Sequence, residues 1–271
     1  MLRFMLDFQA PVLLLFSVSA FVCPSLLLLF IIQKYLKFLI IDTDTKFGDI
    51  FTNSLAMIFG IIFGFIVVSV WESYNHVMDK VSKEANALHN MYRNLDAYPI
   101  NVSTIGKSTL EDYAREVISN EWKLLSADKF DPIAYKKLRE FYEIIVPFRP
   151  KDFGQLAAQQ EMLSLISDYR ELRRNRVENA KSILDTSMWM AFSASALLIT
   201  ILSCLFKTQK FRSHVIYVSV LASGLGIVLF LLLIYDHPFM GPSAITPEPF
   251  EKLLNFYWSN NPNNFNKNSS E

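Results

Sequence analysis

Residue types that commonly do chemistry are few and scattered in this sequence. The histidines form no HxxxH or HExxH pair, and no GxSxG turn, Walker loop or GxGxxG fingerprint occurs. The two cysteines, Cys23 and Cys204, have no metal-ligand spacing around them. The sequence therefore predicts no catalytic site, no metal site and no cofactor. The four histidines are His76, His89, His214 and His237.

The densest group of charges is the segment RELRRNRVENAKS, residues 170–182, which precedes a long apolar run. Two interpretations stay open: a solvated face beside lipid headgroups, or a surface that attracts anions toward the mouth of a pore. Nucleic-acid binding is not expected, because the net charge is zero and no platform of alternating basic and aromatic residues occurs. The basic residues concerned are Arg170, Arg173, Arg174 and Arg176.

Two adjacent stripes with a spacing of four residues lie in one apolar stretch. Small residues recur at Ala56, Gly60 and Gly64, which indicates a helix face that another helix can approach closely. Packing within one subunit would explain them. The large stripe lies one position further along, and its alternatives are lipid contact or, in an oligomer, an apolar ring that gates by dewetting. Its members are Met57, Ile61 and Phe65.

The elements that carry these residues are membrane-spanning helices. Four windows of 21 or 22 residues contain no charged side chain or histidine. At about 1.5 Å per residue each can cross the hydrocarbon core of roughly 30 Å. The first is too long for a signal peptide and lacks a cleavage site, so it is expected to be retained. The windows are Val12–Ile32, Ile50–Trp71, Thr186–Phe206 and Val215–Tyr235.

The predicted architecture is an all-α integral membrane protein with two spans, a helical bundle and two further spans. An N-terminal membrane part, 1–71, with spans at about 12–32 and 50–71, is followed by a water-side bundle, 72–185. A C-terminal membrane part, 186–235, holds spans 186–206 and 215–235. An extended segment with a short amphipathic helix, 236–258, and a disordered Asn-rich tail, 259–271, complete the chain.

The bundle is expected to continue two membrane helices into water. Apolar residues from Tyr74 to Leu95 alternate at spacings of four and three, so one helix from about Ile50 to Leu95 is predicted. Asp131 with Pro132 starts a helix, and another begins near Asp152. No helix breaker follows the latter, so it is predicted to enter the third span as one helix of about 50 residues.

With these elements in place, the chain resembles the bestrophin-like family of bacterial membrane proteins. The resemblance covers nearly the whole chain and is carried by FGIIFGFIVVSVWESYNHVMDKVSKEANALHNMYR, by Glu121-Trp122 and by YDHPFMGPSAITPEPFEKLL. True bestrophins have a similar GF in the second span and a PFG after the fourth, which Gly64-Phe65 and Pro238-Phe239 resemble. The acidic calcium-binding run of animal bestrophins is absent after Pro238-Phe239, so no calcium site is expected.

The resemblance implies a function that the residues alone do not. Bestrophins are pentameric anion channels whose second helix lines an apolar neck, which would place Met57, Ile61 and Phe65 in that neck. The leading hypothesis is therefore an oligomeric, by analogy pentameric, channel that passes small anions across the lipid bilayer. The alternative is a non-conducting membrane scaffold or sensor whose bundle binds a protein partner.

Two signals disagree on orientation. The short loops between spans are basic, which by the positive-inside rule predicts that they are cytoplasmic and the bundle external. The resemblance, together with the basic residues beside the third span, predicts a cytosolic bundle and cytosolic termini in a bacterial inner membrane, and this is the orientation we expect. The basic loop residues are Lys34, Lys37, Lys46, Lys207, Lys210 and Arg212.

Overall fold

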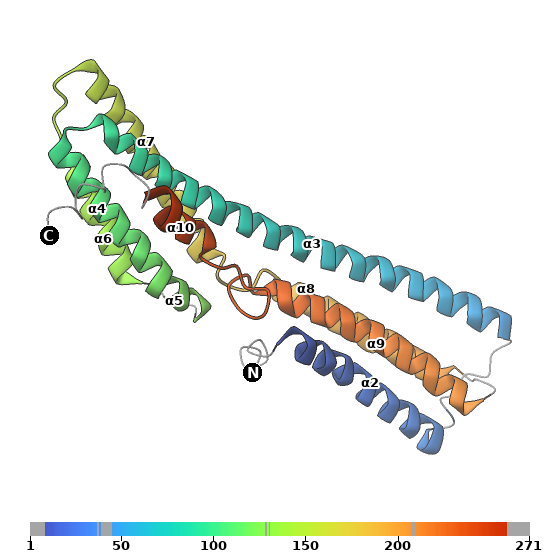
Figure 1. The fold of residues 1–271 in the computed structure, drawn as a ribbon. Helices are drawn as coiled ribbons and strands as arrows, with labels where there is room; N and C mark the ends of the chain where they lie inside the picture. The colour runs from blue at the N-terminus through green and yellow to red at the C-terminus, as the bar shows by residue number, and fades with distance from the viewer. Residues whose placement is uncertain are drawn as a thin grey trace. The chain divides into compact units, whose positions relative to one another are not determined.

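A computed structural model describes residues 9–36, 38, 45–127, 129, 131–206 and 210–258, with backbone only for 45–52. The predicted disordered tail 259–271 lies outside these residues. Every element in the described part is helical (Figure 1): α2 Ala10–Tyr35, α3 Thr45–Asn94, η2 Leu95–Ala97, α4 Ile100–Glu116, η3 Val117–Glu121, α5 Trp122–Ser126, α6 Pro132–Ile145, α7 Phe153–Glu178, α8 Thr186–Leu205, α9 Phe211–Asp236, α10 Glu248–Lys252 and η4 Leu253–Trp258.

The chain divides into two compact units. The first, called the membrane unit here, comprises Met1–Tyr74 and Ser182–Ala244, and the second, the water-side unit, comprises Asn75–Lys181 and Ile245–Glu271. Among the described residues, four helices are long and apolar enough to cross a bilayer: α2, α3, α8 and α9. The predicted all-α membrane fold with four spans is confirmed.

Close packing of α2 on α9 organises the membrane unit, and Figure 1 shows these two helices side by side. Gly226 makes this approach possible, because a Cβ there would lie 2.5 Å from the Cα of Val18 and 2.8 Å from the carbonyl oxygen of Ser17. A second contact joins α3 to α8, where the rings of Phe63 and Phe192 meet edge to face at 5.4 Å. Leu225 of α9 belongs to the same buried cluster.

The expected continuous helix from the bundle into the third span is wrong. Helix α7 ends at Glu178 and α8 begins at Thr186, with non-helical chain between them. Asp236 accepts hydrogen bonds from backbone amides that a continuous helix would pair with its own carbonyl groups. Its carbonyl oxygen accepts from the Ile183 amide at 2.9 Å, and its carboxylate accepts from the Leu184 amide at 2.7 Å. Residues 182–184 are therefore held by the end of α9.

Helix starts in the water-side unit follow capping chemistry. The Asp131 carboxylate accepts from the amide of Ile133, with Pro132 at the first helical position of α6. The Asp152 carboxylate likewise accepts from the amide of Gln155 at the start of α7. Each side chain satisfies an amide that the helix itself leaves without a partner. Between α4 and α5 the helix is interrupted at η3, a π-helical turn, and α5 ends at Ser126.

The predicted short C-terminal helix forms, but its buried face is not that of a regular α-helix. Regular helical spacing would place Phe250, Leu253, Leu254 and Tyr257 on one face, whereas Tyr257 is exposed and Trp258 is buried. The reason is that η4 is a π-helical turn, whose i to i+5 bonding changes the angular position of successive side chains. Phe250, Leu253 and Trp258 thereby become the residues that enter the core.

Gly226→Ala should destabilise the membrane unit, because the added methyl meets backbone atoms of α2 that cannot rotate away. Overpacking of this kind typically costs about 1–3 kcal/mol. Thermal unfolding of the protein in mild detergent measures the effect. Gly224→Ala on the same helix is the control, since no atom lies within 4 Å of its Cβ position. Equal melting temperatures for the two variants would contradict the assigned close contact.

Candidate functional site

The stretch of α3 that carries the two predicted stripes is largely uncovered by its own chain. In its most apolar window 11% of residues are buried, against 22–28% in the other three spans. The large stripe is exposed throughout, with Met57 at 69%, Ile61 at 49% and Phe65 at 72% of full exposure. The structure thus brings these three residues to one face of α3 that contacts no other part of the described membrane unit extensively.

The small stripe does not pack within the subunit either. A Cβ built at Gly60 or Gly64 meets nothing within 4 Å, and Ala56 is exposed. Packing within one chain therefore does not explain these residues. The face of α3 opposite the large stripe makes the contacts inside the chain, through Phe63, Val70 and their partly buried neighbours Phe59, Ile66 and Val67.

A second candidate site is a buried cluster of charges in the water-side unit. The Arg176 guanidinium donates to both oxygens of Glu84, Nε to Oε2 at 2.7 Å and Nη2 to Oε1 at 3.1 Å. Nη2 also donates to Glu121 Oε2 at 2.9 Å, and Arg173 donates to the other oxygen of Glu121. None of these four side chains is more than 9% exposed. Helices α3 and α7 and the turn η3 are thus joined through one network.

Two aromatic rings contact the guanidinium of Arg176 in this ionic cluster. The guanidinium carbon of Arg176 lies 4.9 Å from the ring centroid of Trp122 and 5.8 Å from that of Phe250. Trp122 donates its indole hydrogen to the carbonyl of Ile245 at 2.9 Å. Two of the segments that carry the family resemblance therefore meet at Arg176. They are Glu121-Trp122 and PEPF, residues 247–250.

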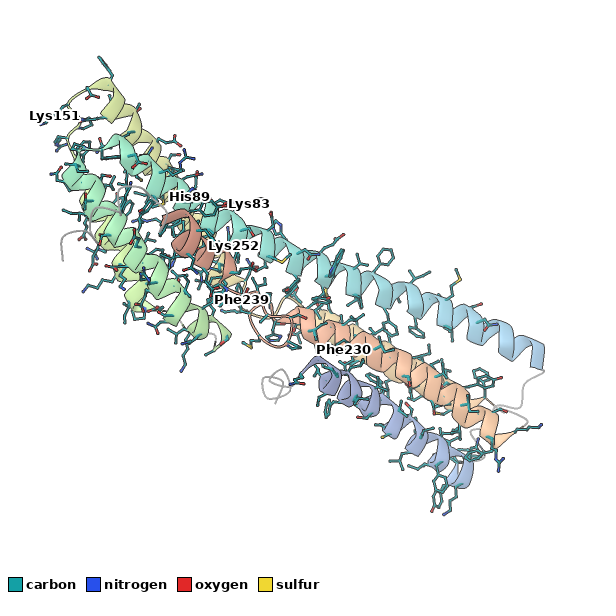
Figure 2. The ribbon with its side chains drawn as sticks, in the orientation of Figure 1. Lys83, His89, Lys151, Phe230, Phe239 and Lys252 are labelled. Carbon is teal, nitrogen blue, oxygen red and sulfur yellow. The ribbon has the colours of Figure 1, made fainter. Side chains whose placement is uncertain are left out.

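The chain after Ile245 is anchored to the water-side unit at its far end as well. Trp258 stacks on Tyr92 with ring centroids 4.4 Å apart. Its indole nitrogen donates to Nδ1 of His89, which is labelled on α3 in Figure 2. Residues 245–258 thus reach from Trp122 and Arg176 in the ionic cluster to Tyr92 and His89 on α3.

The electrostatics of the cluster keep Glu121 ionised. Burial alone would raise the pKa of its carboxyl, but the neighbouring guanidinium groups of Arg176 and Arg173 bring that pKa below its ordinary value. Next to it, the hydroxyl of Tyr169 donates to that of Tyr113 at 2.8 Å, and burial raises the pKa of both phenols. At Glu84 burial has the larger effect and raises the pKa of the carboxyl above its ordinary value, although the Arg176 guanidinium acts in the opposite direction. With two guanidinium groups, an ionised Glu121 and neutral phenols, the arrangement is suited to holding helices in register.

The predicted basic face of residues 170–176 is divided in two. Arg170 and Arg174 are exposed, whereas Arg173 is 7% and Arg176 1% exposed. The expectation that all four arginines face solvent, headgroups or a pore mouth is wrong for Arg173 and Arg176. The reason is that their charges are satisfied by Glu121 and Glu84 inside the bundle. No group of residues in the described part of the chain could hold a metal ion.

Sequence reasoning missed Glu84 and Glu121, although a signal for Glu84 was present. The buried positions Val77, Val81, Glu84, Leu88 and Met91 of α3 follow one another at spacings of four and three. A carboxylate within such an apolar seam indicates a buried partner of opposite charge. Arg173 and Arg176 likewise extend the seam of Met162, Ile166 and Tyr169 on α7. Reading both seams together would have predicted the pairing.

Arg176→Met should strongly destabilise the water-side unit, because it leaves Glu84 buried without a cation. Removing one partner of a buried pair typically costs about 3–5 kcal/mol. Arg174→Met, two residues away, should change the free energy of unfolding by less than about 0.5 kcal/mol, as for an ordinary surface position. Unfolding in mild detergent measures both variants.

The double variant Glu84→Gln/Arg176→Met separates charge from packing. Removing the orphaned carboxylate should restore part of the lost stability, with the double variant more stable than Arg176→Met alone. If Arg176→Met is as stable as Arg174→Met, the ion pair does not contribute in the way described.

The comparison with known proteins agrees with the family resemblance seen in the sequence. A family model described as the Bestrophin-like domain matches residues 19–250, a stretch that includes all four spans at least in part and nearly the whole water-side unit. No curated protein and no solved structure matches the chain. Because the family model covers most of the sequence, the resemblance is confirmed, and the chain belongs to the bestrophin-like family.

Proposed function

We propose that this membrane protein is an oligomeric ion channel that passes small anions through an apolar neck lined by α3. The observation that carries the proposal is the uncovered face of α3, where small and large apolar stripes lie side by side. Family membership supports it, because bestrophins are channels of this kind. The pore would lie on the axis of the oligomer, with one α3 from each subunit.

The two stripes have complementary parts in this proposal. Gly60 and Gly64 leave room for a neighbouring helix to approach the α3 backbone, and no helix of the same chain fills that room. In the oligomer a second subunit does so. Met57, Ile61 and Phe65 then point toward the axis in three layers, about 6 Å apart at four residues per layer. Such rings hold water poorly, so side-chain size controls the barrier to ions.

The proposal places the water-side unit and both termini in the cytosol of a bacterial inner membrane. The buried pairing of Arg173 and Arg176 removes two of the charges that favoured this orientation, which leaves Arg174 and Lys181. Family analogy is therefore the main support. Labelling of single cysteines introduced at Lys210 and at Ser126 with a membrane-impermeant reagent in intact cells distinguishes the two orientations.

A non-conducting scaffold is the second candidate, and one observation favours it. The water-side unit exposes large apolar side chains, with Phe153 at 91% and Ile100 at 79% of full exposure. Exposed apolar surface of this kind is typical of protein-binding faces. In this alternative, the membrane unit is an anchor and the bundle binds a protein partner.

Gly60→Leu/Gly64→Leu should prevent assembly without unfolding the subunit. The added side chains enter space that is empty in the single chain, so the fold is preserved, but they block the approach of a neighbouring helix. Mass measurement in mild detergent should show an oligomer for the parent and a smaller species for the variant. A parent that is monomeric would remove the pore, because four spans of one chain leave no aqueous path.

Replacing Met57, Ile61 and Phe65 together with Ala should widen and wet the neck. We expect a several-fold higher single-channel conductance and weaker gating in reconstituted bilayers, since the apolar barrier depends on side-chain size.

Two control pairs distinguish the neck from other faces of α3. Ile58→Ala/Ile62→Ala alters exposed residues about 80° around the helix from the stripe. Phe59→Ala/Phe63→Ala alters the packed face and should reduce stability rather than change conductance. A larger conductance change in either control pair than in the triple variant would show that another face lines the pore. If the parent passes no ion at all, the scaffold alternative replaces the channel.

A further inference from the structure

The water-side unit has a groove between α6 and α7 in which cationic side chains predominate. It has a volume of about 450 Å³ and is lined by four arginines and one carboxylate, namely Arg139, Arg170, Arg173, Arg174 and Glu178. Tyr135, Leu138 and Val177 form the rest of the wall. A neighbouring hollow of about 630 Å³ shares Arg170 and Arg174 with it and also contains Glu171. These two arginines therefore lie where the two concave surfaces join.

The charge of this groove is only partly compensated within the protein. Arg173 is bound to Glu121, and Arg139 pairs with Glu143 at 2.8 Å in an exposed pair that solvent weakens. Arg174 Nε lies 3.9 Å from Glu178 Oε1, which is beyond hydrogen-bonding distance. Among the described residues, Arg170 forms no ion pair with a carboxylate. At least two guanidinium groups therefore have donors available.

Arg170 is also held in position. Its guanidinium carbon lies 4.5 Å from the ring centroid of Tyr142, so the planar group rests on an aromatic face. Stacking of this kind restrains the side chain and leaves the in-plane N–H donors directed outward. Arg174 lies one helical turn further along α7 on the same groove. Guanidinium groups bind the oxygens of phosphates and carboxylates through such forks of N–H donors.

We propose that this groove binds an anionic ligand that has a phosphate or carboxylate group next to a compact apolar body. Arg170 and Arg174 bind the anionic group, and the wall formed by Tyr135, Leu138 and Val177 contacts the apolar part. The volume lies in the range usual for small-molecule sites. The same chemistry belongs to soluble phosphate esters and to phospholipid headgroups. The site is distinct from the neck and does not depend on conduction.

Calorimetry on the full chain in neutral detergent tests the proposal, with phenyl phosphate as the probe. We expect saturable binding, weaker binding of inorganic phosphate because it lacks the apolar part, and no binding of benzyl alcohol. Arg170→Gln/Arg174→Gln should weaken phenyl phosphate binding about tenfold or more, since hydrogen bonds to charged groups are lost. Both residues are exposed, so the melting temperature should be unchanged.

A matched control removes the same charge elsewhere. Arg93→Gln/Arg115→Gln alters two exposed arginines of the same unit that do not line the groove, and it should bind phenyl phosphate like the parent. Tyr135→Glu places a carboxylate at the exposed wall and should also weaken binding, independently of the arginines.

The source of the ligand is distinguished by a lipid arm. Short-chain phosphatidic acid is titrated in the same detergent against short-chain phosphatidylcholine. Binding of phosphatidic acid that needs Arg170 and Arg174, without binding of phenyl phosphate, assigns the groove to a lipid headgroup, and the reverse assigns it to a soluble ester. The proposal is overturned if neither anion binds saturably. It is also overturned if the groove variant binds as well as the parent, or if the control pair loses binding equally.

Discussion

The guanidinium of Arg176 is held by carboxylates from two different segments and lies against two aromatic rings. Glu84 comes from α3, Glu121 from η3, and the rings belong to Trp122 and Phe250. Removing a cation from water is costly, and the ion pairs and hydrogen bonds to Glu84 and Glu121 offset that cost, although Nη1 of Arg176 has no hydrogen-bond partner among the described residues. The arrangement of the water-side unit is thereby constrained: a shift of any one of these segments would leave a buried charge without a partner. The interaction thus specifies one packing of the helices more than it adds net stability.

The membrane unit is organised by a different principle, the division of α3 into a packed and an uncovered face. Phe63 and Val70 pack against the rest of the unit. On the uncovered face, no atom of the described chain lies within 4 Å of a Cβ at Gly60 or Gly64, and the Phe65 side chain is exposed. In lipid, apolar burial gives little force between helices, so close steric fit decides where they meet. The close fit of Gly226 on α2 is an example inside the subunit. In the proposed oligomer, the open face of α3 would form an equivalent contact between subunits.

Much of the fold could be predicted from the sequence, because spans, caps and seams are local signals. The charge-free windows located the four spanning helices, and Asp131 and Asp152 marked helix starts. The break at 179–185 could not be predicted, since it depends on Asp236, more than 50 residues away. The same holds for the ionic cluster, whose members lie up to 92 residues apart. Residue type alone assigned Arg173 and Arg176 to the surface, and only their partners place them inside.

The composition of the ionic cluster has a consequence for the electric field around the protein. Two carboxylates and two guanidinium groups alternate over a few ångströms, so their charges sum to zero. The potential of such a neutral set decreases with distance much faster than that of a single ion. An anion near the protein would therefore experience little of Arg173 or Arg176. The long-range potential of this part of α7 comes instead from the exposed Arg170 and Arg174, of which Arg174 is only weakly compensated by Glu178 at 3.9 Å.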